Sequence, residues 1–125
     1  MKIDIIVEKT KTGYSAYAEN YPVYSVGSSL NELKINILDA LNLYFENEGK
    51  PIKEKDLKIN LDLPQFFEFY KVINAKALSE RIGINQSLLA QYIKGNKKPS
   101  STQTQRILKG VQQLGRELSE VRFLL

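Results

Sequence analysis

The chain has 125 residues, of which 42% are hydrophobic and 26% charged, a composition typical of one globular domain or two very small ones. It contains no Cys and no His, which excludes thiol nucleophiles, disulfides, ordinary zinc sites and imidazole acid–base catalysis. The net charge of +4 is unevenly divided, since residues 1–63 carry −2 and residues 64–125 carry +6.

The beginning of the chain alternates between apolar and polar residues, as half-buried strands do. Residues 3–7 predict a first strand, and residues 9–13 (KTKTG) predict a hairpin loop that ends in glycine. Residues 13–20 then form the expected return strand, and residues 23–26 a short third strand.

A long amphipathic helix is expected after the third strand. Ser29 is a good N-cap, and Glu32 lies three residues later, which is the capping-box spacing. Gly49 stands where a left-handed C-terminal cap belongs, and Pro51 prevents the helix from continuing. The apolar residues that recur along one face are Leu30, Leu33, Ile37, Leu41 and Tyr44.

A fourth strand is predicted over residues 56–63, because apolar and polar residues alternate there. Its apolar face would comprise Leu57, Ile59, Leu61 and Leu63. The order is then β-β-β-α-β, a small α+β unit with its helix on one side of the sheet. Pro64 suits the first turn of a new helix, so we expect a domain of residues 1–63 and an all-α domain of residues 64–125.

The second half predicts short helices separated by Asn, Gly or Pro. These helices are expected over residues 65–73, 75–82, 86–94 and 102–114. The tail, residues 115–125, is different, because its apolar residues Val121, Phe123 and Leu125 recur at every second position. It predicts a strand or an apolar tail that packs against a partner subunit, or else plain packing on its own domain.

Two of these helices are separated by a tight turn. Asn74 can cap the first helix, Gly83 can end it, and Asn85 can cap the second. Ile84 would fill the corner between them. The residues expected to face inward are Leu78, Ile82, Leu89 and Ile93, and those expected to face outward are Gln86, Ser87, Gln91 and Lys94. This pattern predicts a helix-turn-helix, whose second helix enters the major groove of DNA.

The outward residues suit double-stranded DNA. A Gln amide both donates and accepts, so it can pair with N6 and N7 of adenine, and Ser can serve almost any base edge. Residues 71–109 carry +7, which indicates a polyanionic partner, although single amides and lysines are ordinary on any surface. The candidate base-reading residues are Gln86, Ser87 and Gln91. The candidate phosphate-binding residues are Asn74, Lys76, Lys94, Asn96, Lys97 and Lys98.

Residues 74–100, NAKALSERIGINQSLLAQYIKGNKKPS, resemble the phage-repressor/Xre class of helix-turn-helix domains. The similarity includes the Gly-Ile-Asn turn and the G-x-x-x-P exit at Gly95 and Pro99. It implies that the three base-reading candidates occupy the base-reading positions of that class. A dimer of such domains would read the two half-sites of a palindromic operator.

The first half resembles the HicB antitoxin family, through its hairpin, its third strand and the segment GSSLNELKINILDALNLYF (27–45). The residues that carry this resemblance are Gly27, Ser29, Glu32, Asn36, Asp39, Ala40 and Leu41. It implies a truncated ribonuclease-H-like domain that has no nuclease function and binds a small, basic, HicA-like ribonuclease toxin. The C-terminal domain, in a homodimer or higher homo-oligomer, would repress the promoter of its own operon.

Two other classes of function are weighed against this hypothesis. Two-metal nuclease chemistry needs several carboxylates at one site. The candidates are Asp4, Glu19, Glu32 and Asp39, which are more simply interpreted as strand, capping and surface residues. Without a Gly-rich phosphate loop or a Gly-x-Ser-x-Gly motif, we expect no enzyme, no cofactor and no metal. The alternative is a free-standing regulator whose first domain dimerises or binds a small molecule through Tyr14, Tyr17, Tyr21 and Tyr24.

The sequence also bears on location. The chain begins with MKIDIIVEKTK, whose apolar run is too short for a signal peptide. No segment is apolar over the length that a bilayer span needs. We therefore expect a cytoplasmic protein with no membrane partner.

Overall fold

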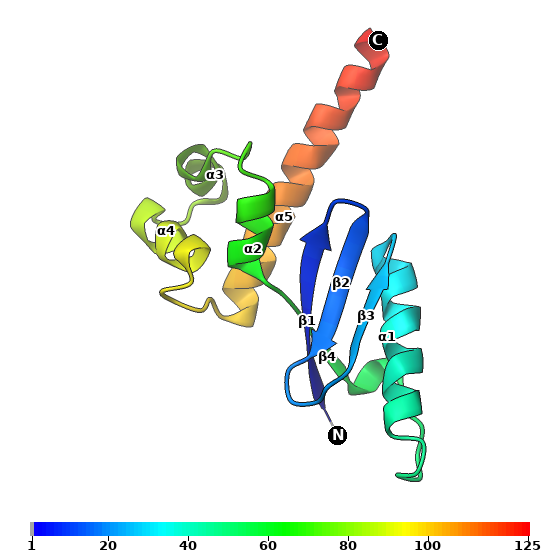
Figure 1. Cartoon of the computed structure of the whole chain (residues 1–125). Coiled ribbons are helices and arrows are strands. Elements are labelled where there is room, and N and C mark those ends of the chain that lie inside the picture. The colour runs from blue at the N-terminus through cyan, green and yellow to red at the C-terminus, as the bar shows by residue number, and fades with distance from the viewer. Residues whose placement is uncertain (1) are drawn as a thin grey trace. The chain divides into compact units, whose positions relative to one another are not determined.

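The first part of the structure is built around a mixed four-stranded sheet (Figure 1). Its strands are β1 (Ile3–Thr10), β2 (Gly13–Ala18), β3 (Tyr24–Gly27) and β4 (Leu57–Leu61). In this computed structural model, which describes residues 2–125, the strand order is β3-β2-β1-β4. β1 is antiparallel to β2 and parallel to β4, and β2 is antiparallel to β3.

The helix α1 (Leu30–Tyr44) covers one face of this sheet. Ile5 and Val7 of β1 lie opposite Ala18 and Ala16 of β2, so small residues leave room for the helix. The helix fills that room with its buried residues Leu33, Ile37 and Leu41. The α+β class and the predicted β-β-β-α-β order are confirmed.

The two ends of α1 agree only in part with the prediction. The Ser29 side chain accepts a hydrogen bond from the Glu32 N–H (3.1 Å), as the predicted N-cap requires. The Glu32 carboxylate accepts a hydrogen bond from the hydroxyl of Ser28. At the other end the predicted C-cap is wrong, because α1 already ends at Tyr44 and Gly49 takes its positive φ (+95°) in the following loop.

Three residues predicted to face inward are instead about half exposed. Leu30 and Tyr44 lie in the first and the last turn of α1, and their side chains are 50% and 49% exposed. Ile59 of β4 is 45% exposed. Since α1 packs on β2 and β3 while β4 forms the opposite edge of the sheet, the helix leaves Ile59 uncovered. Alternation alone does not reveal how far a covering helix reaches.

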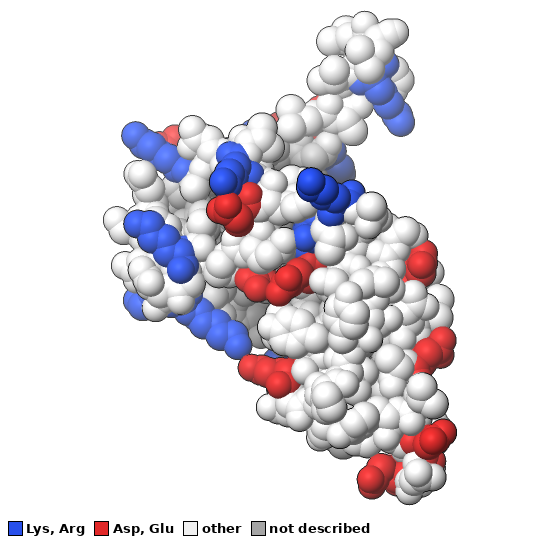
Figure 2. Space-filling view, in the orientation of Figure 1, with Lys and Arg blue, Asp and Glu red and all other residues white. Residues whose placement is uncertain are grey.

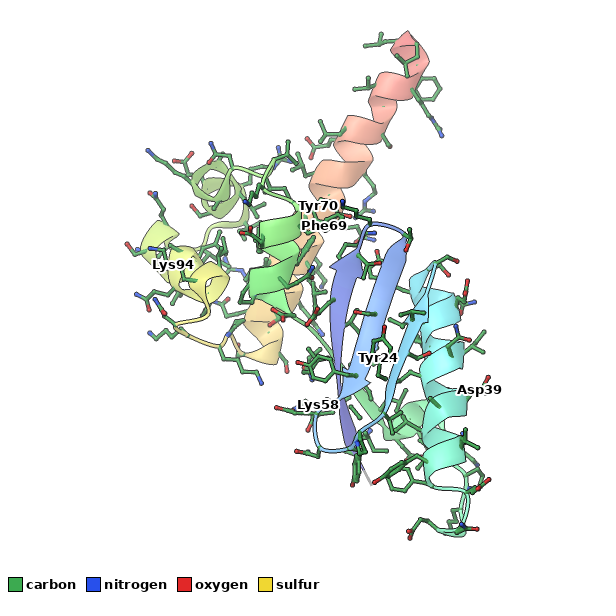
Figure 3. All side chains as sticks on the ribbon, viewed as in Figure 1. Tyr24, Asp39, Lys58, Phe69, Tyr70 and Lys94 are labelled. Carbon is green, nitrogen blue, oxygen red and sulfur yellow. The ribbon has the colours of Figure 1, made fainter. Side chains whose placement is uncertain are left out.

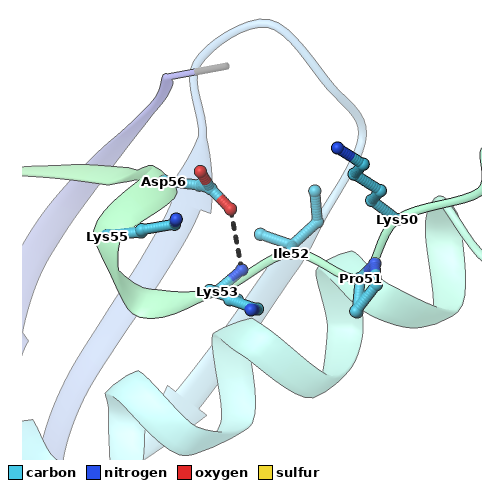
Figure 4. A pocket seen from close by; sticks show the side chains of 6 residues that line it. All are labelled: Lys50, Pro51, Ile52, Lys53, Lys55 and Asp56. Carbon is cyan, nitrogen blue, oxygen red and sulfur yellow. Dashed lines mark hydrogen bonds between the residues drawn. The ribbon is translucent and has the colours of Figure 1, made fainter.

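The segment between α1 and β4 is held by Asn42. Its Oδ1 accepts a hydrogen bond from the Ile52 N–H (2.6 Å), and its Nδ2 donates one to the Ile52 carbonyl (3.0 Å). Both backbone polar groups of Ile52 are thereby satisfied, and its side chain joins the core. In the next turn, η1 (Glu54–Asp56), the Asp56 carboxylate accepts a hydrogen bond from the Lys53 N–H (2.9 Å; Figure 4).

A short helix, α2 (Leu63–Phe69), follows β4. Asp62 caps it by accepting a hydrogen bond from the Gln65 N–H (3.0 Å), and Pro64 lies in its first turn, as predicted. The Gln65 amide then bonds both backbone groups of Lys9 in β1: Oε1 accepts from the N–H (2.8 Å) and Nε2 donates to the carbonyl (2.7 Å). This pair of bonds fastens α2 to the sheet.

The chain divides into two compact units, Met1–Phe69 and Tyr70–Leu125. The expected boundary after residue 63 assigned α2 to the second domain, whereas the structure groups it with the sheet. The bonds between Gln65 and Lys9 account for this difference, because they join residues that lie far apart in the sequence. The predicted helix over residues 65–73 accordingly ends at Phe69.

The second unit consists of helices α3 (Ala75–Ile82), α4 (Gln86–Lys94) and α5 (Ser101–Ser119), followed by the 3-10 turn η2 (Glu120–Leu124). Its buried apolar residues are Leu78, Ile84, Leu89, Tyr92 and Ile107. The strand considered for the tail is wrong, since α5 continues to Ser119 and η2 follows. Within residues 2–125, no helix combines the length and the apolar character needed to cross a bilayer.

Candidate nucleic-acid interface

Helices α3 and α4 are joined by a turn of three residues. Gly83 has a left-handed conformation (φ +72°), which side chains other than glycine rarely adopt. The Ile84 N–H donates to a carbonyl of α3 (3.0 Å), and the Ile84 side chain is buried in the corner. The Asn85 Oδ1 accepts from the N–H groups of Ser87 (2.9 Å) and Leu88 (3.2 Å). The predicted turn and second cap are therefore present.

The start of α3 is also capped. The Asn74 Oδ1 accepts a hydrogen bond from the Ala77 N–H (3.0 Å), so this predicted phosphate contact also has a structural task. Lys76 is exposed in the first turn. The buried Ser79 donates its hydroxyl to the Lys76 carbonyl (2.6 Å), which satisfies the only polar side chain in the core of the described residues.

Arg106 of α5 fastens the turn. Its Nη2 donates to the carbonyls of Ile82 (2.8 Å) and Gly83 (3.0 Å), and its Nη1 donates to the Gln103 Oε1 (3.2 Å). A cation at the C-terminal end of a helix is also favoured by the helix dipole. Sequence reasoning counted Arg106 only as part of the positive field. No local signal could have found this clasp, because its carbonyl partners lie at the end of α3 and in the turn that follows it.

Helix α4 has one buried and one exposed face. Leu89 and Tyr92 are buried, whereas Ile93, predicted to face inward, is only half-buried. The exposed residues are Gln86, Ser87, Gln91 and Lys94. At about 100° per residue, Ser87, Gln91 and Lys94 fall within about 60° of one another. They lie on the side of the helix opposite the buried Leu89 and Tyr92. Lys94 lies at the C-terminal end of α4 (Figure 3).

The chain leaves α4 through a compact exit. Gly95 has a left-handed conformation (φ +80°), as expected for a glycine that ends a helix. The N–H groups of Asn96 (3.0 Å) and Lys97 (3.3 Å) both donate to the Gln91 carbonyl. The backbone of this exit is therefore held against the last turn of α4, while the side chains of residues 96–98 are exposed.

The basic residues of the second unit are spread over all of its helices. Residues 70–125 contain ten Lys or Arg and three Glu, and none of the acidic residues lies on α4 or in its exit. Arg81 is engaged in an ion pair with Glu117 that joins α3 to α5. The exposed cations on α3, α4 and the exit include Lys76, Lys94, Lys97 and Lys98. Figure 2 shows basic side chains spread over α3 and α4.

The four carboxylates considered for catalysis are spread over β1, the end of β2 and α1 of the first unit. Asp4 lies on β1, and its carbonyl accepts from the N–H of Glu19, just after β2 (2.9 Å). Glu32 is at the start of α1, and Asp39 is exposed on the same helix (Figure 3). Among residues 2–125, no group of three or more His, Cys, Asp or Glu side chains could hold a metal ion.

The four tyrosines considered for a pocket do not gather on one face. Tyr14 and Tyr21 are partly buried against the core beneath α1. Tyr17 and Tyr24, paired across β2 and β3, are 40% and 66% exposed. Desolvation and then nearby carboxylates raise the pKa of Tyr17 above its ordinary 10.0. These carboxylates are Glu8, Asp62 and Glu19. This part of the sheet is therefore aromatic and acidic.

A shallow hollow beside η1 is lined by Lys50, Pro51, Ile52, Lys53, Lys55 and Asp56 (Figure 4). The backbone hydrogen bond from Lys53 lowers the pKa of Asp56 below its ordinary 3.8, so this carboxylate stays ionised at neutral pH. An exposed carboxylate that caps its own turn is a poor proton donor or acceptor for catalysis. We therefore assign the hollow no role.

The structure thus groups the candidates by element. Ser87 and Gln91 share the exposed face of α4, and Gln86 is exposed in its first turn. Asn96, Lys97 and Lys98 follow in the exit, and Asn74 and Lys76 lie at the start of α3. These positions are fixed by the N-caps Asn74 and Asn85, by the left-handed Gly83 and Gly95, and by the hydrogen bonds of Arg106 to the turn. No protein-family model matches this chain, and no curated protein matches it either.

Proposed function

We propose that the protein is a DNA-binding antitoxin that represses its own operon. One observation carries the DNA-binding half: α4 exposes Ser87 and Gln91 on one face and Gln86 in its first turn, and it leads directly into an exit that holds two lysines. Because capped ends and the Arg106 clasp hold this helix, its side chains are positioned before DNA arrives. Double-stranded DNA is the polyanion that combines readable base edges with regularly spaced phosphates.

In this proposal α4 lies in the major groove with its N-terminal residues on base edges. Gln86 and Gln91 can each pair with N6 and N7 of an adenine, and Ser87 can donate to or accept from most bases. The lysines of α4 and its exit would contact phosphates and fix the register. Lys76 would contact a phosphate at the N-terminus of α3, where backbone N–H groups also favour an anion.

The antitoxin half of the proposal rests on the first unit. Its observed β-β-β-α-β order supports the resemblance of residues 27–45 to the HicB family. Gly27, which carries part of that resemblance, has a physical reason to be glycine, because a Cβ there would lie 2.5 Å from the backbone N of Leu33. We propose that this unit is the truncated ribonuclease-H-like domain and binds a small, basic, HicA-like toxin. Residues 1–69 contain eight Lys and eleven Asp or Glu, which favours a basic partner.

A free-standing regulator is the second candidate, and the exposed pair Tyr17 and Tyr24 favours it. Tyrosine is common at both protein interfaces and ligand sites, so this pair suits dimerisation or a small molecule as well as a toxin. We propose no catalytic activity for either candidate. The protein would act in the cytoplasm in both cases, where its DNA lies.

Site-specific variants test the DNA-binding half after the operator has been selected from random DNA. Gln91→Ala should relax base preference, at a cost of about 1–3 kcal/mol on the selected site. Lys97→Ala should weaken binding to all sequences and reduce the salt dependence by about one counterion. The matched controls are Gln112→Ala on α5 and Lys58→Ala on β4, which should leave binding unchanged. Equal losses on selected and random DNA for Gln91→Ala would refute the assignment of α4 as the recognition helix.

Co-expression with the product of the adjacent small reading frame tests the antitoxin half. A stable complex that restores growth would support the antitoxin, and substitutions in the first unit should abolish rescue without changing DNA binding. If the neighbouring product is harmless and no complex forms, the regulator is the better proposal. The DNA-binding half is unaffected by either result.

A further inference from the structure

A seven-residue repeat runs along α5 and into η2. Apolar residues recur there at alternating steps of four and three, namely Ile107, Val111, Leu114, Leu118, Val121 and Leu125. If Val111 is position a of a heptad, Leu114 is d, Leu118 is the next a and Val121 the next d. Such a repeat is characteristic of a helix that winds around a second helix.

The second unit itself covers only the beginning of this stripe. Ile107 is fully buried, whereas Leu118 is 58% exposed and Leu125 is 98% exposed. Figure 1 shows the end of α5 and η2 extending beyond α3 and α4. Val121, three residues after Leu118, stays on the same side in η2, because a 3-10 turn has three residues. Leu125, four residues after Val121, would join the stripe where η2 takes α-helical geometry in a dimer. The second half of the stripe is therefore an exposed apolar surface.

Two charged residues flank this surface. Glu117 occupies position g, and Arg122 occupies the next position e. In a parallel two-stranded coiled coil, the g residue of one helix faces the next e residue of the other. Opposite charges would then meet on both sides of a symmetric pair. An antiparallel pair would instead bring Glu117 against Glu117 and Arg122 against Arg122, which is repulsive.

We propose that residues 111–125 of two copies of this chain form a parallel coiled coil that makes the protein a homodimer. A second copy fits because the stripe and its flanking charges are complementary to themselves under two-fold symmetry. The two α3–α4 pairs would then lie at the same end of the coil, as a palindromic site requires. The role of the dimer in reading a palindromic site rests on the proposed DNA binding, whereas the dimer itself does not.

Sedimentation equilibrium of the full chain, without DNA, tests the dimer. The wild-type chain should form dimers, and Leu118→Glu should raise the dissociation constant at least about tenfold by placing charges in the seam. Phe123→Glu is the matched control, because Phe123 is 74% exposed at position f, outside the seam. A monomeric wild-type chain, or equal dimerisation of both variants, would overturn the proposal.

Charge reversal tests the parallel orientation. Glu117→Arg and Arg122→Glu should each weaken the homodimer, and an equimolar mixture of the two variants should regain wild-type association, because each new charge then meets its opposite. Glu117 also pairs with Arg81 within the chain, so Arg81→Gln serves as a control that should still dimerise. A mixture that associates no better than the separate variants would rule out the parallel pairing.

The natural absence of cysteine allows a direct test of register. In a parallel coil with equal register, position a of one helix lies beside position a of the other. Mild oxidation of Leu118→Cys should therefore give a covalent dimer, and Glu120→Cys, at the outer position c, should not. Equal cross-linking of both variants would contradict the proposed seam.

Discussion

The same substitution at two glycines of α5 should change stability in opposite directions. Gly110 and Gly115 both lie inside this helix, where replacing glycine by alanine normally stabilises by about 1 kcal/mol. A Cβ at Gly115 would meet nothing within 4 Å, so Gly115→Ala should realise most of that gain. A Cβ at Gly110 would lie 2.1 Å from the Cγ2 of Ile82 in α3.

The clash at Gly110 should exceed the gain in helix propensity. Two carbon atoms prefer a separation of about 3.5–4.0 Å, so one of the two groups must move by roughly 1.5 Å. The methyl group of Ile82 cannot turn away easily, because β-branched residues have one strongly preferred rotamer in a helix. Separating α5 from α3 would loosen Leu78, whose Cδ1 lies only 3.9 Å from the same Cβ position. Overpacking of this kind costs about 1–3 kcal/mol.

Urea unfolding followed by circular dichroism at equal protein concentrations measures both variants. Because the propensity gain is common to both, the difference in unfolding free energy between Gly115→Ala and Gly110→Ala isolates the clash, about 1–3 kcal/mol. The double variant Ile82→Ala with Gly110→Ala should recover part of the loss relative to Ile82→Ala alone. Equal stabilities for Gly110→Ala and Gly115→Ala would refute the close approach of α5 to α3.

Three further substitutions test contacts that the structure assigns to single side chains. Asn42→Ala should destabilise the chain by about 1–3 kcal/mol, because it leaves both backbone groups of Ile52 unpaired. Asn47→Ala in the exposed loop should have no effect, and urea unfolding compares the two. Arg106→Ala should lower stability by about 1 kcal/mol and weaken binding to selected and random DNA alike, so a loss confined to selected DNA would contradict the clasp. Asp56→Asn should destabilise at neutral pH, because the folded state holds the pKa of Asp56 below 3.8 and its carboxylate stabilises the fold above that pH. Thermal unfolding across pH should show this difference shrinking as the pH falls below 3.8.

Features that depend on neighbours in the sequence could be predicted. Ser29, Asn74 and Asn85 cap helices through backbone groups two or three residues away, and Gly83 takes the left-handed conformation that its turn requires. The strand faces and the order of elements also follow from short-range alternation and helical periodicity. These signals were sufficient for the α+β unit and for the exposed face of α4.

Features that depend on distant partners could not be predicted. The hydrogen bonds between Gln65 and Lys9, which group α2 with the sheet, join residues that are 56 positions apart in the sequence. The Arg106 clasp joins α5 to the turn, and nothing near Arg106 marks it. The exposure of Ile59 depends on how much of the sheet α1 covers. The alternation of the tail is too short to separate a strand from a helical end, since Val121 and Leu125 also fit a heptad.

The contact between Gly110 and Ile82 also connects the stability of the second unit with its proposed reading of DNA. Gly110 lets α5 approach α3 closely, and the ion pair between Arg81 and Glu117 holds the same two helices further along. In the proposed dimer, α5 carries the seam and α3 carries the turn that orients α4. The distance and angle between the two recognition helices would then be set by how α5 packs on α3. A variant that remains folded and dimeric but loosens this packing should therefore tolerate a wider range of half-site spacings, and selection of operators with varied spacers would measure it.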